Sequence, residues 1–287
     1  MKLKELQHLF QNKLKAHYLK QEIDTFFFML SEFYFGIKRL DLALNPNLKV
    51  DEPHHILQAL EALEKHVPIQ YIIGKTEFYG LTFKVDEHTL IPRPETEELV
   101  DWILSEIENF DIPKSILDIG TGSGSIAVSL AKKLTGSKVY ALDVSEEALE
   151  IAKGNGILNG VDVVMIKTDI LKKDLWPTLF KNQKFDIIVS NPPYVLETEK
   201  LKMKANVLNY EPHVALFVED NDPLLFYREI TGFSKAHLKK GGMLFFEINE
   251  KLGNDMLALL SHAGFEELEM RQDIFGKDRM IKAIQNQ

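Results

Sequence analysis

Strand and helix patterns alternate along the chain from Glu95 to the C-terminus, and this alternation constrains the fold more than any other feature. Apolar runs typical of buried strands fall near 115–119, 138–143, 162–167, 185–190, 242–248, 266–271 and 279–284. Amphipathic stretches typical of helices fall near 95–108, 124–134, 145–158, 222–239 and 251–263. Such alternation is typical of an α/β fold in which crossover helices cover a mostly parallel sheet. We therefore predict an α/β domain with seven strands.

The N-terminal part of the chain has a different, wholly helical pattern. Apolar and aromatic residues recur there at helical spacing, which predicts a small all-α bundle with a phenylalanine-rich core. Between residues 68 and 90 the period changes to an alternation around Gly80, which predicts a β-hairpin. We expect a helical domain at 1–72, a β-hairpin linker at 73–90 and the α/β domain at 91–287. Because residues 1–72 carry none of the motifs described below, we assign them to docking a protein substrate.

Composition narrows the classes of function. The chain has 287 residues, a formal net charge of -9 and no Cys. An acidic balance disfavours indiscriminate nucleic-acid binding, because such binding depends on neutralising phosphates. The lack of Cys excludes a disulfide framework or a zinc–thiolate site and fits a reducing cytoplasm. No apolar run approaches the roughly 18 residues that cross a bilayer, so we expect no membrane binding. We further expect a cytoplasmic monomer that binds no metal and no nucleic acid directly.

A glycine-rich loop follows the first predicted strand of the α/β domain and precedes a helix. Glycines at alternate positions let the backbone turn tightly and let a ligand approach it closely. A dinucleotide-binding loop would have Gly or Ala where this chain has Ser125. Asp118, just before the loop, would repel a pyrophosphate but attract the cationic amino-acid end of S-adenosylmethionine. We therefore predict that S-adenosylmethionine binds at the loop residues Gly120, Thr121, Gly122, Ser123 and Gly124.

Two further acids follow the next strands. Asp143 ends the second strand, where a carboxylate can accept hydrogen bonds from both hydroxyls of a ribose. Asp143 could instead cap the helix that begins near Ser145. Asp169 ends the third strand and could reach an adenine amino group or be a solvated turn residue.

The fourth predicted strand, 185–190, leads into Asn191-Pro192-Pro193-Tyr194 at its carboxyl end, where open α/β sheets bind ligands. Two prolines make a stiff turn without backbone donors. An amide nitrogen is a poor nucleophile, and acceptors at Asn191 Oδ1 and the Pro192 carbonyl would align it and raise its electron density. Tyr194 could stack on the flat group. These residues predict methyl transfer to a planar amide or amine nitrogen. We expect Asn191, Pro192 and Tyr194 to be catalytic residues and Asn191, Pro192, Pro193 and Tyr194 to bind the substrate. The alternative is that the segment is only a structural, proline-rich turn.

Three other motifs accompany this turn. They read Pro-Ile-Gln-Tyr at 68–71, Leu-Ile-Pro-Arg-Pro-Glu-Thr-Glu at 90–97 and Tyr-Glu-Pro-His-Val-Ala-Leu at 210–216. Together with the glycine loop and the Asn-Pro-Pro-Tyr turn, they make the chain resemble the bacterial peptide chain release factor glutamine methyltransferases, the PrmC/HemK family. The resemblance covers nearly the whole chain.

The resemblance implies a class I, Rossmann-like methyltransferase domain preceded by a helical bundle and a β-hairpin. It implies S-adenosylmethionine as the methyl donor and, as the substrate, the Gln in the Gly-Gly-Gln loop of peptide chain release factors. By position it implies cofactor contacts from the glycine loop, Asp143 and Asn191, and from Trp176 beside the adenine. The chain departs from the family at Asn249 and Leu252, where a Gly and a Gln are usual, and these departures bear on packing rather than on the reaction.

Other functions remain open at the level of sequence. A nucleic-acid methyltransferase acting on the exocyclic amine of adenine could use the same turn, although it would need a basic groove and a flipped base. A nicotinamide dehydrogenase is disfavoured by Ser125, and a catalytically silent binding module by the intact turn at 191–194.

Overall fold

The computed structural model describes residues 1–107 and 112–286 of the chain. Contacts divide the chain into two compact units, one formed by Met1–Gly74 with Lys204–Tyr210 and the other by Lys75–Met203 with Glu211–Gln287. Within the described residues, no helix is long and apolar enough to cross a membrane. The predicted helix end at residue 108 and the final residue of the expected α/β domain, 287, lie outside the described residues.

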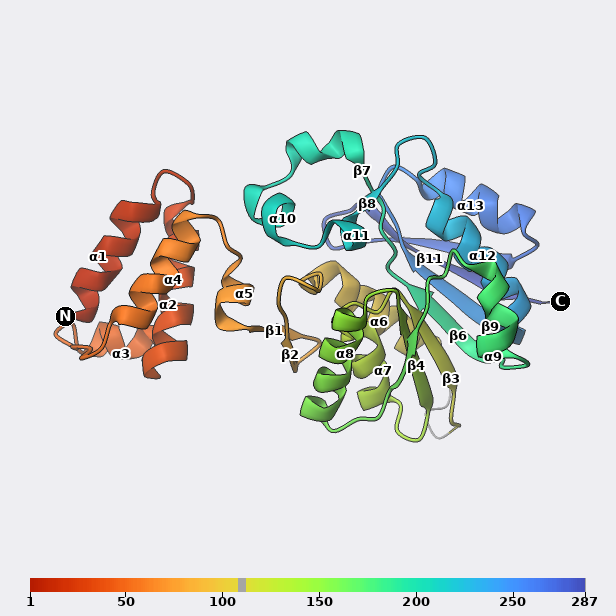
Figure 1. Ribbon diagram of the computed structural model, residues 1–287, viewed down its shortest axis with the longest axis horizontal. Coiled ribbons are helices and arrows are strands. Elements are labelled where there is room, and N and C mark those ends of the chain that lie inside the picture. Colours follow the sequence, from red (N-terminus) through yellow and green to blue (C-terminus); the bar gives the residue numbers. More distant parts are fainter. Residues whose placement is uncertain (108–111, 287) are drawn as a thin grey trace. The chain divides into compact units, whose positions relative to one another are not determined.

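The N-terminal unit is a helical bundle, as predicted. Its helices are α1 (Leu3–Leu14), α2 (Lys20–Phe35), α3 (Arg39–Leu44), α4 (His54–Glu64) and α5 (Ile69–Ile73) (Figure 1). The side chains that recur at helical spacing are buried, and Phe10 packs edge-on against Phe27 with ring centroids 5.4 Å apart. A segment distant in sequence, α10 (Ala205–Tyr210), belongs to the same unit, where the Tyr210 hydroxyl donates to the Lys65 carbonyl at 2.7 Å.

The second unit contains a seven-stranded sheet within the described residues, and the predicted α/β fold is confirmed. The strand order is β10-β11-β9-β6-β3-β4-β5. Strand β11 runs antiparallel to both of its neighbours, and the other neighbouring strands pair in parallel. The strands are β3 (Ser115–Ile119), β4 (Lys138–Asp143), β5 (Val164–Lys167), β6 (Phe185–Ser190), β9 (Leu238–Glu247), β10 (Glu266–Gln272) and β11 (Asp278–Gln285).

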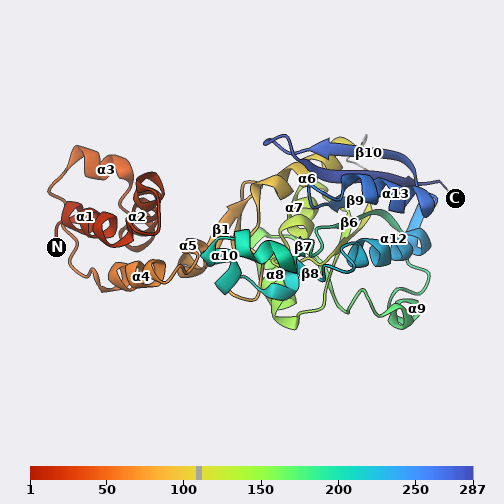
Figure 2. The same ribbon diagram turned by 90° about the horizontal axis from the view of Figure 1, so that it is seen from above.

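Helices cover both faces of this sheet. Helices α6 (Pro94–Ser105), α7 (Ser125–Lys133) and α8 (Glu146–Asn159) lie on one face, and α9 (Trp176–Phe180), α12 (Leu225–His237) and α13 (Gly253–His262) on the other. Figure 2 shows α12 and α13 next to each other beside the strands. Successive strand residues alternate between the two cores, with Ile116 in the first and Leu117 in the second. Burial on both faces explains why the strands are continuous apolar runs.

The predicted hairpin is formed by β1 (Lys75–Phe78) and β2 (Leu81–Lys84). Its two turn residues, Tyr79 and Gly80, have φ of 52° and 71°, as a type I′ turn requires. The sequence did not predict the short elements after β5 and β6, because one or two turns show no period. These are η1 (Lys173–Leu175), β7 (Val195–Leu196), η2 (Glu197–Lys202), α10, α11 (His213–Leu216) and β8 (Phe217–Val218), in addition to α9.

A buried asparagine joins the hairpin to the sheet domain. Asn155 of α8 is fully buried, and its Oδ1 accepts a hydrogen bond from the Lys84 N–H at 2.7 Å. Its Nδ2 donates to the carbonyl oxygens of Lys84 at 3.0 Å and Ser123 at 2.9 Å. One turn later, Asn159 Nδ2 donates to the Thr82 carbonyl at 2.9 Å. The amide of Asn155 therefore completes the hydrogen bonds of the hairpin edge and of the glycine loop together.

We expect Asn155→Ala to lower the free energy of unfolding by about 2–3 kcal/mol, because backbone groups of Lys84 and Ser123 lose their partner away from water. Urea unfolding measures this loss. Asn159→Ala, at the more exposed end of the helix, is the matched control and should cost less than about 1 kcal/mol. Equal losses in the two variants would contradict the role given to Asn155.

Candidate active site

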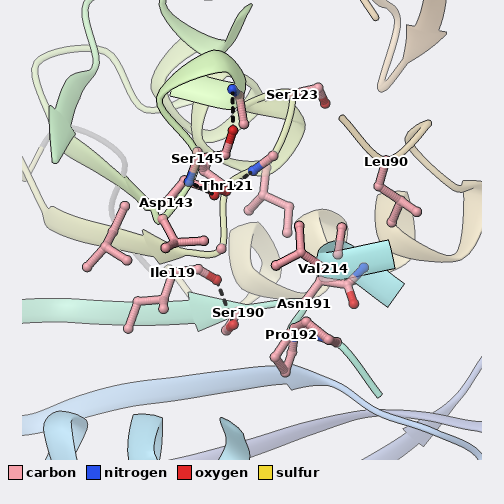
Figure 3. A pocket seen from close by; sticks show the side chains of 18 of the residues that line it. Leu90, Ile119, Thr121, Ser123, Asp143, Ser145, Ser190, Asn191, Pro192 and Val214 are labelled. Carbon is pink, nitrogen blue, oxygen red and sulfur yellow. Dashed lines mark hydrogen bonds between the residues drawn. The ribbon is translucent and has the colours of Figure 1, made fainter. Parts of the chain in front are cut away.

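The carboxyl ends of β3, β4 and β6 surround one cavity within the second unit (Figure 3). Its lining includes residues 119–123 after β3, 142–145 after β4 and 190–193 after β6. The chain runs from β3 outward to β5 and then returns to β6 on the other side of β3. The cavity therefore lies at the point where the strand order reverses, which is where open α/β sheets bind ligands.

The three glycines of the predicted loop have two different roles. Gly120 and Gly122 line the cavity with φ of 75° and 53°, and an added Cβ at either would meet nothing within 4 Å. Thr121 and Ser123 also line the cavity. Gly124 does not, and a Cβ there would lie 2.9 Å from Ala152 Cβ on α8. The first two glycines open the backbone toward the cavity, and Gly124 lets α7 pack closely on α8.

Asp143 lines the cavity and does not cap the next helix. The N-cap of α8 is Ser145, whose Oγ accepts from the Ala148 N–H at 3.1 Å. The two carboxylate oxygens of Asp143 accept from the N–H groups of Gly122 at 2.8 Å and Ser145 at 3.0 Å. Burial raises the pKa of this carboxyl, and the backbone hydrogen bonds oppose that rise. Each oxygen keeps a further lone pair for a ligand hydroxyl.

The Asn-Pro-Pro-Tyr turn is only partly in the cavity. Asn191, Pro192 and Pro193 line it, but Tyr194 does not. The Tyr194 hydroxyl instead donates to Glu247 Oε1 at 2.9 Å, and burial raises the pKa of this phenol well above its usual value. The structure therefore places the Tyr194 ring behind the lining, where it supports the turn, and its predicted stacking on a substrate stays a prediction.

Trp176, the predicted neighbour of the adenine, also lies outside the lining. Its Nε1 donates to the Ile170 carbonyl at 3.2 Å, and its ring packs edge-on against Phe233. The apolar side chains that line the cavity include Ile170 and Phe226. No sequence pattern pointed to Phe226, because it lies in an amphipathic helix outside every motif.

Asp169 also lines the cavity, and its Oδ1 accepts from the Leu171 N–H at 2.9 Å. Next to it, the buried Oγ1 of Thr168 has no hydrogen-bond partner among the described residues. A polar ligand in the cavity could satisfy this hydroxyl. Among the residues that the structure describes, no group of three or more His, Cys, Asp or Glu side chains could hold a metal ion.

A chain of polar side chains leads away from Asn191. Asn191 Nδ2 donates to Thr96 Oγ1 at 3.4 Å, and Thr96 Oγ1 donates to Glu247 Oε2 at 2.6 Å. Glu247 is only 1% exposed, and this burial raises its pKa. The hydrogen bonds from the Thr96 and Tyr194 hydroxyls and the nearby charge of Arg279 oppose the rise. Sequence reasoning missed both residues, although Thr96 lies within the motif at 90–97.

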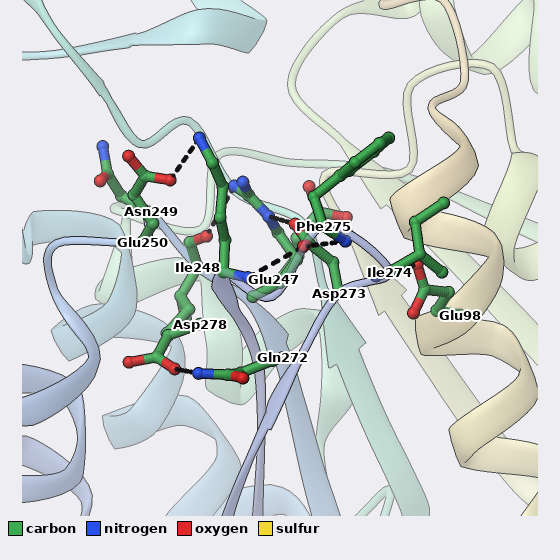
Figure 4. A network of polar contacts seen from close by, with 12 residues as sticks. Glu98, Glu247, Ile248, Asn249, Glu250, Gln272, Asp273, Ile274, Phe275 and Asp278 are labelled. Carbon is green, nitrogen blue, oxygen red and sulfur yellow. Dashed lines mark hydrogen bonds and ion pairs between the residues drawn. The ribbon is translucent and has the colours of Figure 1, made fainter.

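The end of β9 is fixed further by the turn between β10 and β11 (Figure 4). Asp273 is buried, and its Oδ2 accepts from Arg279 Nε at 3.1 Å. Arg279 Nη1 donates in turn to the Ile248 carbonyl at 3.2 Å, beside Glu247. Buried charges that pair in this way resist displacement, because separating them leaves a charge without compensation.

The two departures from the family pattern also have structural roles. Asn249 Nδ2 donates to the Tyr194 carbonyl at 3.2 Å and to Glu199 Oε2 at 3.2 Å, so it holds the backbone of the turn. Leu252 is buried in the core between the sheet and α13. Both positions therefore contribute packing and support.

Arg93 lines the cavity and is held by a buried partner. Its Nη2 donates to Glu211 Oε1 at 2.6 Å, and Glu211 Oε2 accepts from the Ile91 N–H at 3.3 Å. The Glu211 side chain is 1% exposed. The pair fixes the segment before α6 against the segment after α10.

Asp118 lies beneath the glycine loop and outside the lining. It is fully buried, and its Oδ2 accepts from the Thr121 hydroxyl at 2.6 Å. Burial is the main cause that raises its pKa to about 7, and the nearby Asp143 adds to the rise. The expected attraction of a cationic ligand by Asp118 would therefore act through the loop and not by direct contact.

Comparisons with known proteins find relatives that match this chain over nearly its whole length. A family model described as "Methyltransferase small domain" matches residues 100–210, and one described as "PrmC N-terminal domain" matches residues 5–74. The release factor glutamine methyltransferase of Flavobacterium psychrophilum is 49% identical over 98% of this chain and 99% of its own length. That of Bacteroides thetaiotaomicron is 42% identical over 95% of this chain and 96% of its own.

Solved structures support the fold alone. A methyltransferase from Pyrococcus furiosus aligns with 82% of this chain and 98% of its own at 20% identity and a TM-score of 0.53. The 16S rRNA N2 G1207 methyltransferase of Thermus thermophilus aligns with 74% of this chain and 50% of its own at 16% identity and a TM-score of 0.52.

The raised pKa of Asp118 predicts a pH dependence of stability. The pKa is about 7 in the folded protein and about 4 in an unfolded chain, so the folded state binds more protons between these pH values. Stability linked to Asp118 therefore falls as the pH rises from about 4 to about 7 and is constant above that, and the fall is at most about 4 kcal/mol. Urea unfolding of wild type and Asp118→Asn across this range isolates the effect, since Asn does not titrate. Parallel pH profiles would show that Asp118 titrates normally.

Proposed function

The chain belongs to the release factor glutamine methyltransferase family, and on that premise we propose that it methylates the side-chain amide nitrogen of the Gln in the Gly-Gly-Gln motif of peptide chain release factors, with S-adenosylmethionine as the methyl donor. Relatives of that name are 49% and 42% identical to this chain over nearly its whole length, and this supports the proposed substrate. The observation that carries the chemistry is the presence of Asn191, the glycine loop and Asp143 in the lining of one cavity.

The cavity suits S-adenosylmethionine by the chemistry of its lining. The free lone pairs of Asp143 fit the two hydroxyls of a ribose. Ile170 and Phe226 offer apolar side chains to a flat ring, and the unpartnered hydroxyl of Thr168 offers it a polar contact. The open backbone at Gly120 and Gly122 leaves room for the amino-acid end. When bound, this cofactor supplies an activated methyl group on a sulfonium.

The protein's own part in the reaction is to position the amide nitrogen. Asn191 Oδ1 and the Pro192 carbonyl accept hydrogen bonds from the two N–H groups of the substrate amide, which fixes the nitrogen and raises its electron density. The prolines at 192 and 193 contribute no competing donors and keep the turn stiff. Because the protein holds the nitrogen in line with the methyl group, the reaction avoids the entropic cost of bringing and orienting the two groups in water. Transfer leaves the nitrogen positively charged with the new methyl group and two protons, and one of these protons then leaves to water to give the neutral N-methyl amide.

The direct test is mass spectrometry of a release factor before and after incubation with the protein and the methyl donor. We expect one added methyl group, on the Gln of the Gly-Gly-Gln motif. A parallel assay with tritiated donor offers release factor, DNA and RNA side by side. Label in nucleic acid and none in release factor would replace this proposal with adenine methylation.

Two substitutions should separate transfer from cofactor binding. Asn191→Ala should lower kcat by about 100-fold, because it removes an acceptor that positions the nucleophile, and leave cofactor affinity within a few-fold. Asp143→Ala should instead weaken cofactor affinity by about 1.5–3 kcal/mol, the contribution of hydrogen bonds to a charged group. Calorimetry and single-turnover assays measure the two quantities. An Asn191→Ala enzyme within tenfold of wild-type turnover would argue against the amide clamp.

We further propose that residues 1–72 dock the release factor, since they have their own core and contribute nothing to the cavity lining. A chain that begins at Ile73 should still bind S-adenosylmethionine but methylate intact release factor at least about tenfold more slowly, because remote docking contacts are gone. A short Gly-Gly-Gln peptide is the matched control, and both proteins should methylate it equally. Circular dichroism checks that the shorter chain folds. A folded short chain that methylates intact release factor at the full rate would refute docking.

A further inference from the structure

The chain of hydrogen bonds behind Asn191 joins three separate elements. Asn191 directly follows β6, and Glu247 is the last residue of β9. These strands pair in parallel with Ser190 opposite Phe246, so the next residue of each strand emerges at the same edge of the sheet. Thr96 lies in the first turn of α6, and its side chain bonds to both. The three side chains are therefore held by the sheet and by one helix, and not by loops alone.

With the Glu247 carboxyl ionised beside Arg279, the direction of each hydrogen bond in this chain follows. The Thr96 and Tyr194 hydroxyls donate to the two carboxylate oxygens of Glu247, at 2.6 Å and 2.9 Å. A hydroxyl carries one proton, so Thr96, once it donates to Glu247, can only accept from Asn191. Asn191 must then turn its Nδ2 toward Thr96, at 3.4 Å. The remaining edge of the amide, Oδ1, is left to face the other way.

This direction matters because the two edges of an asparagine amide have the same shape and opposite hydrogen-bonding character. With Oδ1 toward the cavity, Asn191 accepts a hydrogen bond from the substrate amide. With Nδ2 toward the cavity, it would present N–H groups to the N–H groups of the substrate. Local packing distinguishes the two orientations poorly, and the buried carboxylate supplies the distinction.

We infer that Glu247 is a positioning residue that acts through Thr96 to hold the side-chain amide of Asn191 with its oxygen toward the substrate. The inference rests on the proposed function, because methylation of an amide nitrogen requires an acceptor at Asn191 Oδ1. The inference explains what holds that oxygen toward the substrate. Glu247 lies outside the cavity lining, whereas Thr96 lines the cavity together with Asn191, and the role inferred for both is to orient the Asn191 amide. Their effect is on the orientation of Asn191 and so on the rate of transfer.

Substitution of Thr96 tests this inference with matched controls. Thr96→Val keeps the shape of the side chain and removes its hydroxyl, whereas Thr96→Ser keeps the hydroxyl. Tyr227→Phe removes another buried hydrogen bond to Glu247, from the Tyr227 hydroxyl to the Glu247 backbone carbonyl at 3.1 Å, and leaves the route to Asn191 intact. We expect Thr96→Val to lower kcat by about tenfold or more with the KM for S-adenosylmethionine within about threefold, and the two controls to keep the wild-type kcat within about threefold.

A second readout does not depend on turnover. In protein with ¹⁵N-labelled asparagine, the Asn191 side-chain protons should exchange with solvent faster and shift in Thr96→Val, but not in Thr96→Ser or Tyr227→Phe. Thermal unfolding and cofactor binding check that each variant is folded, and Thr96→Ala replaces Thr96→Val if the latter is not.

Wild-type kcat in the folded variant without the hydroxyl would overturn the inference, as would equal losses in all three variants. If wild type does not methylate release factor, the proposed function fails, and the exchange measurement still tests the orientation of Asn191.

Discussion

A sheet that is buried on both faces leaves only the ends of its strands for polar chemistry, and every part of the candidate site depends on this constraint. The two apolar cores take up successive residues of each strand in turn, so the side chains that can meet a ligand are those at the carboxyl end of a strand or just after it. Asp143 and Asn191 occupy that position on β4 and beside β6. Parallel pairing brings these ends to one edge, and the reversal of strand order between β3 and β6 separates the helices enough to leave a cavity.

Charged groups buried just behind this edge determine how the lining is presented. Asp118 holds the glycine loop through Thr121, and Glu211 holds Arg93. Glu247 holds both Thr96 and Tyr194. A buried carboxylate is costly unless its oxygens are satisfied, so each one tolerates few arrangements of its neighbours. The rigidity that transfer to a weak nucleophile requires thus comes from residues that do not line the cavity.

The helical bundle and the domain that carries this edge are two distinct compact units. The bundle has its own core, and its described residues contribute none of the lining. The short helix α10 is counted with the bundle although it follows the Asn-Pro-Pro-Tyr turn in sequence, and Glu211 comes directly after it. One continuous segment therefore runs from the turn, through the bundle, to the residue that holds Arg93.

The sequence by itself determined the strands, the long helices, the hairpin and the two loops that line the cavity. These features depend on local rules: the period of apolar residues, the tolerance of Gly for positive φ and the stiffness of paired prolines. It also supplied the family, since several separate motifs agreed.

The pairs of side chains that support those loops come together only through the tertiary fold. Thr96 and Glu247 are 151 residues apart, and Arg93 and Glu211 are 118 residues apart, so no local pattern connects them. The same limit applies to Tyr194 and Trp176, which lie outside the cavity lining and donate hydrogen bonds to Glu247 and to the Ile170 carbonyl, so their predicted contacts with a ligand stay predictions. A residue's position in the chain indicates which loop it belongs to, but the direction of its side chain depends on the neighbours that folding brings to it.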